Sequence, residues 1–71
     1  MDRNVINSLL RLRKLGFNPT NILDIGAHHG YWSLSSRRVF PNANYMLIEA
    51  IKYNELSNYC TQIPNFDYKN L

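Results

Sequence analysis

The chain contains little of what builds a secreted or membrane-bound protein. Its single cysteine, Cys60, cannot form an internal disulfide, so no disulfide-built secreted domain is implied. No apolar run approaches the roughly 18 residues that a membrane-spanning helix needs. The first residues lead into no apolar segment of the signal-peptide type. We therefore expect a cytoplasmic protein with no membrane partner.

Glycine and proline are also scarce, with three of each among 71 residues, and neither low-complexity segments nor repeats are visible. The length allows one small domain. A chain of this size buries only about 60% of the surface that its unfolded form exposes. The sequence therefore predicts a single globular unit of marginal stability.

Acidic residues are fewer than basic ones, which gives a net charge of +3 and an isoelectric point near 9.3. Such a value raises the hypothesis of a small basic nucleic-acid-binding protein. Most of the excess charge belongs to Arg11, Arg13, Lys14, Arg37 and Arg38. These side chains fall in or near the last turns of predicted helices, where cations complement the helix dipole. No aromatic and basic RNA-binding signature accompanies them, so nucleic acid is the less favoured partner.

Hydrophobic spacing and turn residues predict six elements in the order α-β-α-β-α-β. Helices are expected over residues 3–15, 31–40 and 53–61, and strands over residues 21–25, 44–49 and 66–71. Asp2 is placed to cap the first helix and Gly16 to end it. The continuous apolar run of the first strand suits a parallel strand covered on both faces.

This alternation predicts an α/β fold with right-handed crossovers, the N-terminal part of a Rossmann-like, doubly wound parallel sheet that is incomplete. The expected domain, residues 1–71, comprises the leading helix, a ligand-binding βαβ unit over residues 21–49, and a helix and third strand over residues 53–71. The first strand would keep an open edge, which favours self-association. We therefore expect the front part of a larger domain.

The candidate site is the turn after the first strand together with the end of the second. Asp24 precedes Gly26 and Gly30, and Glu49 closes the second strand. A strand-to-helix reversal needs glycine, and backbone amides at a helix start favour a carboxylate or phosphate. The two oxygens of Glu49 match the two vicinal hydroxyls of a ribose. Asp24 is expected either to cap loop amides or to contact the ligand directly.

The spacing of the glycines disfavours a dinucleotide. A G-x-G-x-x-G fingerprint starting at Gly26 would need glycine where the chain has His28 and Tyr31. The phosphate-binding G-x-x-x-x-G-K-[ST] pattern is absent as well. Adjacent histidines in one turn point apart, and no further ligand has suitable spacing, so His28 and His29 predict no metal site.

The segment from Asp24 to Ser33 resembles the first motif of class I S-adenosylmethionine-dependent methyltransferases, most closely of the FkbM type. In that family a D-x-G-A-x-x-G motif and a phrase like Phe40-Pro41-Asn42-Ala43 precede a strand that ends in glutamate. The resemblance covers roughly residues 10–71. One departure is Ala50-Ile51-Lys52, where family members often have proline or Asn-Pro.

The resemblance implies roles for five residues. Gly26, Ala27 and Gly30 would lie against the methionine part of S-adenosylmethionine, Asp24 would organise the loop, and Glu49 would hold the ribose hydroxyls. The implied reaction is O-methylation of a small-molecule or sugar hydroxyl.

The residues that would bind adenine, shape the acceptor pocket or act as a base are not among those that the resemblance assigns. We expect little turnover from the chain alone. The alternative is an inactive, truncated remnant or an interaction fragment.

Overall fold

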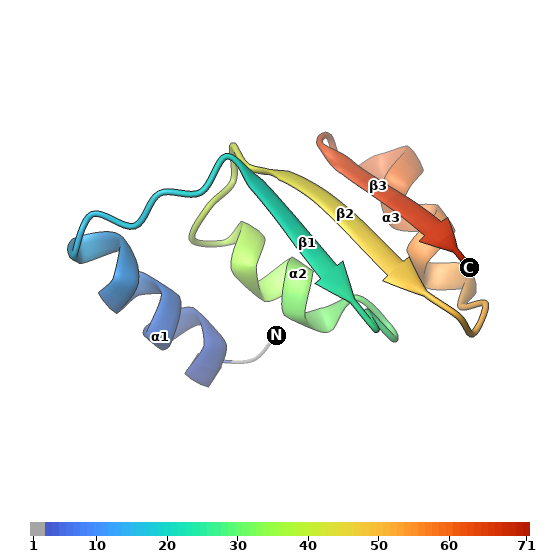
Figure 1. Ribbon diagram of the computed structural model, residues 1–71, viewed down its shortest axis with the longest axis horizontal. Helices are drawn as coiled ribbons and strands as arrows, with labels where there is room; N and C mark the ends of the chain where they lie inside the picture. Colours follow the sequence, from blue (N-terminus) through green and yellow to red (C-terminus); the bar gives the residue numbers. More distant parts are fainter. Residues whose placement is uncertain (1–2) are drawn as a thin grey trace.

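The computed structural model describes residues 3–71, whose elements follow one another in the alternating order that the sequence predicts. The helices are α1 (Arg3–Lys14), α2 (Tyr31–Arg37) and α3 (Asn54–Gln62), and the strands are β1 (Asn21–Ile25), β2 (Asn44–Glu49) and β3 (Phe66–Asn70). The strands form one parallel sheet in the order β1-β2-β3 (Figure 1). The α/β class and the parallel pairing are therefore confirmed. Among these helices, none has the length and apolar character to cross a bilayer.

Gly16 ends α1, as predicted. Its φ of +98° is one that residues with side chains rarely adopt. The Phe17 N–H donates to the Leu12 carbonyl and the Gly16 N–H to the Arg13 carbonyl, both at 3.0 Å. This pair of bonds is the Schellman motif, which satisfies the last carbonyls of a helix. The predicted cap at Asp2 lies outside the described residues.

The second helix is shorter than predicted, because α2 ends at Arg37 and not at residue 40. The Arg38 N–H donates to the Ser35 carbonyl, three residues back, at 3.1 Å. Such bonds tighten the backbone beyond α-helical geometry. Pro41 also disfavours a helical conformation for the residue before it, so the helix cannot continue to that point.

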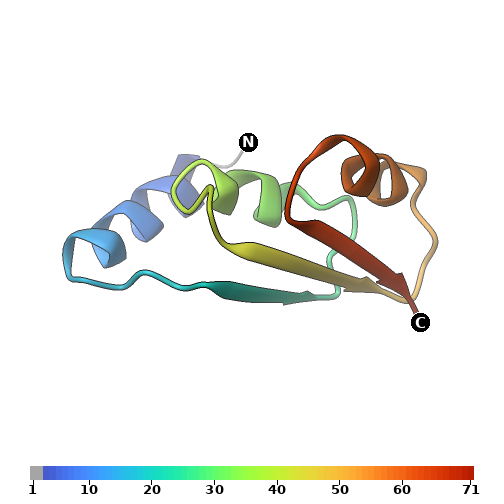
Figure 2. The same cartoon turned by 90° about the horizontal axis from the view of Figure 1, so that it is seen from above.

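All three helices lie on the same face of the sheet (Figure 2). The buried apolar side chains between them and the sheet are Ala27, Val39, Phe40, Ala43, Tyr45, Leu47, Leu56 and Phe66. On the opposite face, Leu23 and Ile25 of β1 are 59% and 73% exposed. The expectation that the first strand is covered on both faces is wrong for residues 3–71, because every described helix packs on one side.

Three serines of α2 are completely buried: Ser33, Ser35 and Ser36. A buried hydroxyl needs a hydrogen-bond partner. The Ser36 hydroxyl lies 3.0 Å from the hydroxyl of Tyr45, which donates to the Phe40 carbonyl at 3.1 Å. These bonds connect α2 and the segment after it to β2, and burial raises the pKa of Tyr45.

The substitution Leu56→Ala tests the core beneath α3. The Leu56 side chain is fully buried, so its truncation removes apolar burial and leaves a cavity. We expect the free energy of unfolding in urea to fall by about 2–5 kcal/mol. Leu15→Ala, at a position that is 84% exposed, is the matched control and should change it by less than about 0.5 kcal/mol. Equal losses in the two variants would contradict this description of the core.

Candidate functional site

The candidate site lies at the carboxyl ends of β1 and β2, which are neighbours in the sheet. Ile25 and Ile48 are paired in the parallel register, so both strands end at the same edge. The turn of residues 26–30 and the segment of residues 50–53 leave the sheet there. Ligands of open α/β sheets bind beyond this edge.

Gly26 reverses the chain at the end of β1 with a φ of +72°. Its N–H and the N–H of Ala27 both donate to the Ile48 carbonyl, at 2.8 and 3.1 Å, which ties the turn to β2. A Cβ added at Gly26 would meet no atom within 4 Å. The backbone therefore borders open space, as the close approach of a ligand requires.

Gly30 is needed for a different reason. It is buried and has a φ of +81°. A Cβ added there would lie 3.0 Å from Leu56 Cδ2 and 3.0 Å from Tyr59 Cε2, both on α3. The absence of a side chain at Gly30 thus allows α3 to pack against the turn. Packing explains this glycine without any ligand.

The amides of the turn are largely engaged within the chain. Besides the bond from Ala27 to β2, the Gly30 N–H donates to the Ala27 carbonyl and the His28 N–H to Glu49 Oε1, each at 2.8 Å. The Ala27 side chain is only 6% exposed and belongs to the core. The expectation that the turn amides are available to an anionic ligand is therefore corrected for those of Ala27, His28 and Gly30. The anion that the turn holds is the carboxylate of Glu49.

Glu49, the last residue of β2, is fixed through both of its carboxylate oxygens. While Oε1 accepts the His28 N–H, Oε2 accepts the Ile51 N–H at 3.0 Å. The hydrogen bonds from Ile51 and from His28 hold the pKa of Glu49 below its ordinary value, because they stabilise the ionised form. The Asn70 side chain at the end of β3 donates to the Glu49 carbonyl at 2.9 Å. Nothing in the sequence pattern singled out Asn70, because its role depends on strand pairing.

Asp24, in β1, connects that strand to the helix that follows the turn. Its Oδ2 accepts a hydrogen bond from the Ser33 hydroxyl at 2.7 Å. Since Ser33 lies in the first turn of α2, this bond fixes the start of the helix relative to β1. Among the described residues, the partner of Asp24 is therefore a side chain of α2, whereas the sequence predicted loop amides or the ligand.

A second carboxylate, which the sequence analysis did not identify, lies beside the turn. Glu55 Oε1 is 3.0 Å from His29 Nδ1, and both side chains are roughly half exposed. The backbone N–H of Glu55 itself and the His29 ring lower the pKa of Glu55. The His29 ring stacks on Tyr31 and lies 4.4 Å from the ring of Tyr53. Together these contacts tie the turn to the start of α3. The sequence signal that could have pointed to Glu55 was its position in the first turn of a predicted helix.

Within residues 3–71, no three His, Cys, Asp or Glu side chains are grouped so as to hold a metal ion. Cys60 is half-buried on α3, and burial raises the pKa of its thiol. A raised pKa leaves little thiolate at neutral pH, so Cys60 has the properties of a packing residue.

Comparisons of the chain with models of protein families, with curated proteins and with solved structures found no match in any of the three. The site is therefore interpreted from its own geometry. That geometry ties Gly26 and Ala27 to Ile48, ties Glu49 to the same turn through His28, and places Asp24 and Gly30 in supporting positions.

The two glycines of the turn should respond differently to Gly26→Ala and Gly30→Ala. Both variants force alanine to a positive φ, which costs about 1–2 kcal/mol. Gly30→Ala must also displace Leu56 and Tyr59, which adds about 1–3 kcal/mol of overpacking. We expect the larger loss of unfolding free energy for Gly30→Ala in urea denaturation. Equal losses would show that the space beside the two glycines does not differ.

Glu49 should make folding stability depend on pH. Its pKa is lower in the folded than in the unfolded chain, where the ordinary value is 4.5. The ionised carboxylate therefore stabilises the fold above that value, and this stabilisation is lost as the pH falls through the folded-state pKa. Thermal unfolding between neutral and strongly acidic pH should show Glu49→Gln less stable at neutral pH and with a shallower acid decline. An unchanged acid decline in the variant would contradict the assigned hydrogen bonds.

Proposed function

We propose that this chain is the cofactor-binding front part of an S-adenosylmethionine-dependent methyltransferase of the FkbM type, with the incomplete Rossmann-like sheet that such a part would have. One observation carries the proposal. An ionised Glu49 and a glycine bordered by open space, Gly26, lie side by side at the carboxyl ends of two neighbouring parallel strands. This is the pair of features from which α/β folds build a ribose-bearing cofactor site.

The geometry of Glu49 is compatible with a ribose. A carboxylate offers about four acceptor positions, and the N–H groups of His28 and Ile51 occupy two of them. The others remain for two hydroxyl donors, and the lowered pKa of Glu49 favours the ionised form that accepts them. The side chain is only 7% exposed, so a ribose would displace part of the segment of residues 50–52. The Ile51 side chain is 60% exposed, so moving it would disturb no core packing, whereas moving the Ile51 backbone would break its hydrogen bond to Glu49 Oε2.

The described residues would bind and orient the cofactor. S-adenosylmethionine supplies a methyl group activated by a sulfonium. Gly26 would permit its approach to the backbone, Glu49 would hold the ribose, and Asp24 would keep the turn in place through Ser33. Enzymes of this type act mainly by positioning the reacting groups. The acceptor implied by the resemblance is a small-molecule or sugar hydroxyl, and no described residue is assigned as its base.

A second candidate is an inactive remnant or interaction fragment with the same ancestry. The exposed face of β1 favours it, since Leu23 and Ile25 are apolar and uncovered in the described chain. Nucleic-acid binding has weaker support. The Arg13 guanidinium donates to the Val39 carbonyl at 3.0 Å and Arg37 is half-buried, so part of the basic charge is engaged in packing.

Calorimetric titration with S-adenosylhomocysteine tests the proposal on the wild-type chain, Glu49→Gln and Glu55→Gln. We expect binding to the wild type and a loss of about 10- to 100-fold in affinity for Glu49→Gln, because hydrogen bonds to a charged group contribute about 1.5–3 kcal/mol. Glu55→Gln makes the same chemical change beside the turn and should bind like the wild type. Circular dichroism confirms that each variant is folded.

Two results would contradict the proposal: a folded wild-type chain that does not bind the ligand, or equal affinity in Glu49→Gln. A parallel titration with a short duplex and a single-stranded oligonucleotide tests the hypothesis of a nucleic-acid-binding protein. That hypothesis requires an affinity for the oligonucleotide that falls steeply with salt. We expect no such binding.

A further inference from the structure

The sheet face that carries no helix has its side chains arranged in rows across the strands. The amino-terminal row consists of Asn21 and Asn44, which form a hydrogen bond at 3.4 Å. The two rows beyond it are Leu23, Met46 and Asp67, and then Ile25, Ile48 and Lys69. The face thus presents an apolar block on β1 and β2, bordered by amides at one end and by opposite charges on β3.

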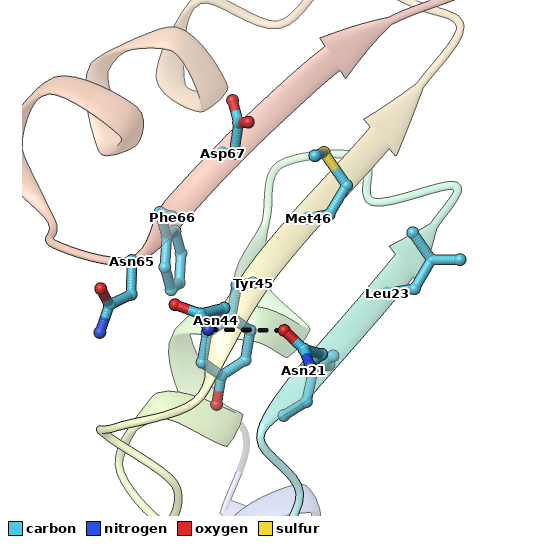
Figure 3. Close-up of a pocket in the computed structure, with 9 residues that line it drawn as sticks. Asn21, Leu23, Asn44, Tyr45, Met46, Asn65, Phe66 and Asp67 are labelled. Carbon is cyan, nitrogen blue, oxygen red and sulfur yellow. Dashed lines mark hydrogen bonds between the residues drawn. The ribbon is translucent and has the colours of Figure 1, made fainter.

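The apolar block is exposed on β1, where Leu23 and Ile25 are 59% and 73% exposed. A hollow of about 630 Å³ lies over the amino-terminal part of the sheet, and Asn21, Asn44, Leu23, Met46 and Asp67 are among the residues that line it (Figure 3). Contiguous apolar surface with a polar rim marks an interaction site in soluble proteins. The part of the chain that the structure describes leaves this surface uncovered.

The charges on β3 indicate what fits there. Asp67 and Lys69 lie two residues apart on the same face, one in each row, and the ion pairs among the described residues involve neither of them. Asp67 Oδ1 accepts the Tyr68 N–H at 2.8 Å, which leaves Oδ2 for another donor. A partner surface should therefore present a base opposite Asp67, an acid opposite Lys69, and apolar side chains beside them.

The same face of a second copy of the chain, rotated by 180°, presents these groups. We infer that two copies of the chain pair face to face about a two-fold axis that lies between the sheets and runs across the strands. The axis places each row of one copy opposite the other row of the second copy. Leu23 then faces Ile25, Met46 faces Ile48, and Asp67 faces Lys69, each twice. An isologous interface requires such self-complementarity, and packed sheets lie about 10 Å apart with strands within about 30° of alignment.

The dimer is weak because the face is small. Three strands of about five residues span roughly 14 by 16 Å. A standard stable interface buries at least about 1,200 Å², and pairing two such faces buries less than that. The association therefore belongs among the transient ones. Pairing through the free edge of β1 would leave the face exposed, so the two modes of association respond to different substitutions. The inference does not use the proposed cofactor site, and it concerns the 71-residue chain, in which no described helix covers this face.

Analytical ultracentrifugation over a range of concentrations tests the pairing. We expect a monomer–dimer equilibrium of the 8.3 kDa chain. The variant Leu23→Ser should weaken it about tenfold or more, through loss of an apolar side chain that the interface buries. Leu15→Ser, at an exposed position in the turn that follows α1, is the matched control and should leave it unchanged. A monomer up to about 1 mM, open-ended aggregation, or a dimer insensitive to Leu23→Ser would each overturn the inference.

Charge exchange tests the orientation of the two copies. Asp67→Lys alone places lysine opposite Lys69 twice and should weaken the dimer about tenfold, given that each exposed ion pair contributes up to about 1 kcal/mol. The double variant Asp67→Lys with Lys69→Asp restores opposite charges and should recover the wild-type affinity. Lys14→Asp, a charge change on α1, is the control. A double variant as weak as the single one would exclude the two-fold arrangement.

Discussion

The carboxylate of Glu49 joins the turns that follow β1 and β2. One oxygen binds the His28 N–H of the first turn and the other binds the Ile51 N–H of the second, so a single side chain sets how both segments leave the sheet. The same hydrogen bonds lower the pKa of Glu49, because they stabilise its ionised form. The turn that resembles a cofactor motif is therefore shaped around an anion that the chain itself supplies. Any ligand that uses Glu49 must share it with these amides.

The remaining structure follows from having helices on one face only. The hydroxyls of Ser33 and Ser36 connect α2 to Asp24 of β1 and Tyr45 of β2, and Gly30 lets α3 pack against the turn. The opposite face keeps its apolar side chains exposed. A parallel sheet is usually covered on both faces. The surface that would bind a second copy is thus a direct consequence of this one-sided packing.

Much of the fold could be predicted, because its signals are local. Apolar runs, the glycine after α1 and the proline after α2 placed the six elements, and only the end of α2 differed by more than one residue. The site was less predictable. The glycine spacing pointed to both Gly26 and Gly30, yet their surroundings differ, since only the fold brings α3 against Gly30. The bonds from Ser33 to Asp24 and from His29 to Glu55 join segments that no sequence pattern relates. Burial of β1 on both faces was inferred from its composition, which does not reveal which helices are present to cover it.

A two-dimensional amide NMR spectrum of the chain, recorded with and without S-adenosylhomocysteine, shows most directly whether the turn around Glu49 binds the cofactor. A dispersed spectrum in which the ligand shifts the amides of Gly26, Ala27, His28, Glu49 and Ile51, with α1 unaffected, is the predicted result. It would show that the turn around Glu49 is the cofactor site. A dispersed spectrum that the ligand leaves unchanged, or in which the shifts fall on the exposed sheet face, would contradict the assignment.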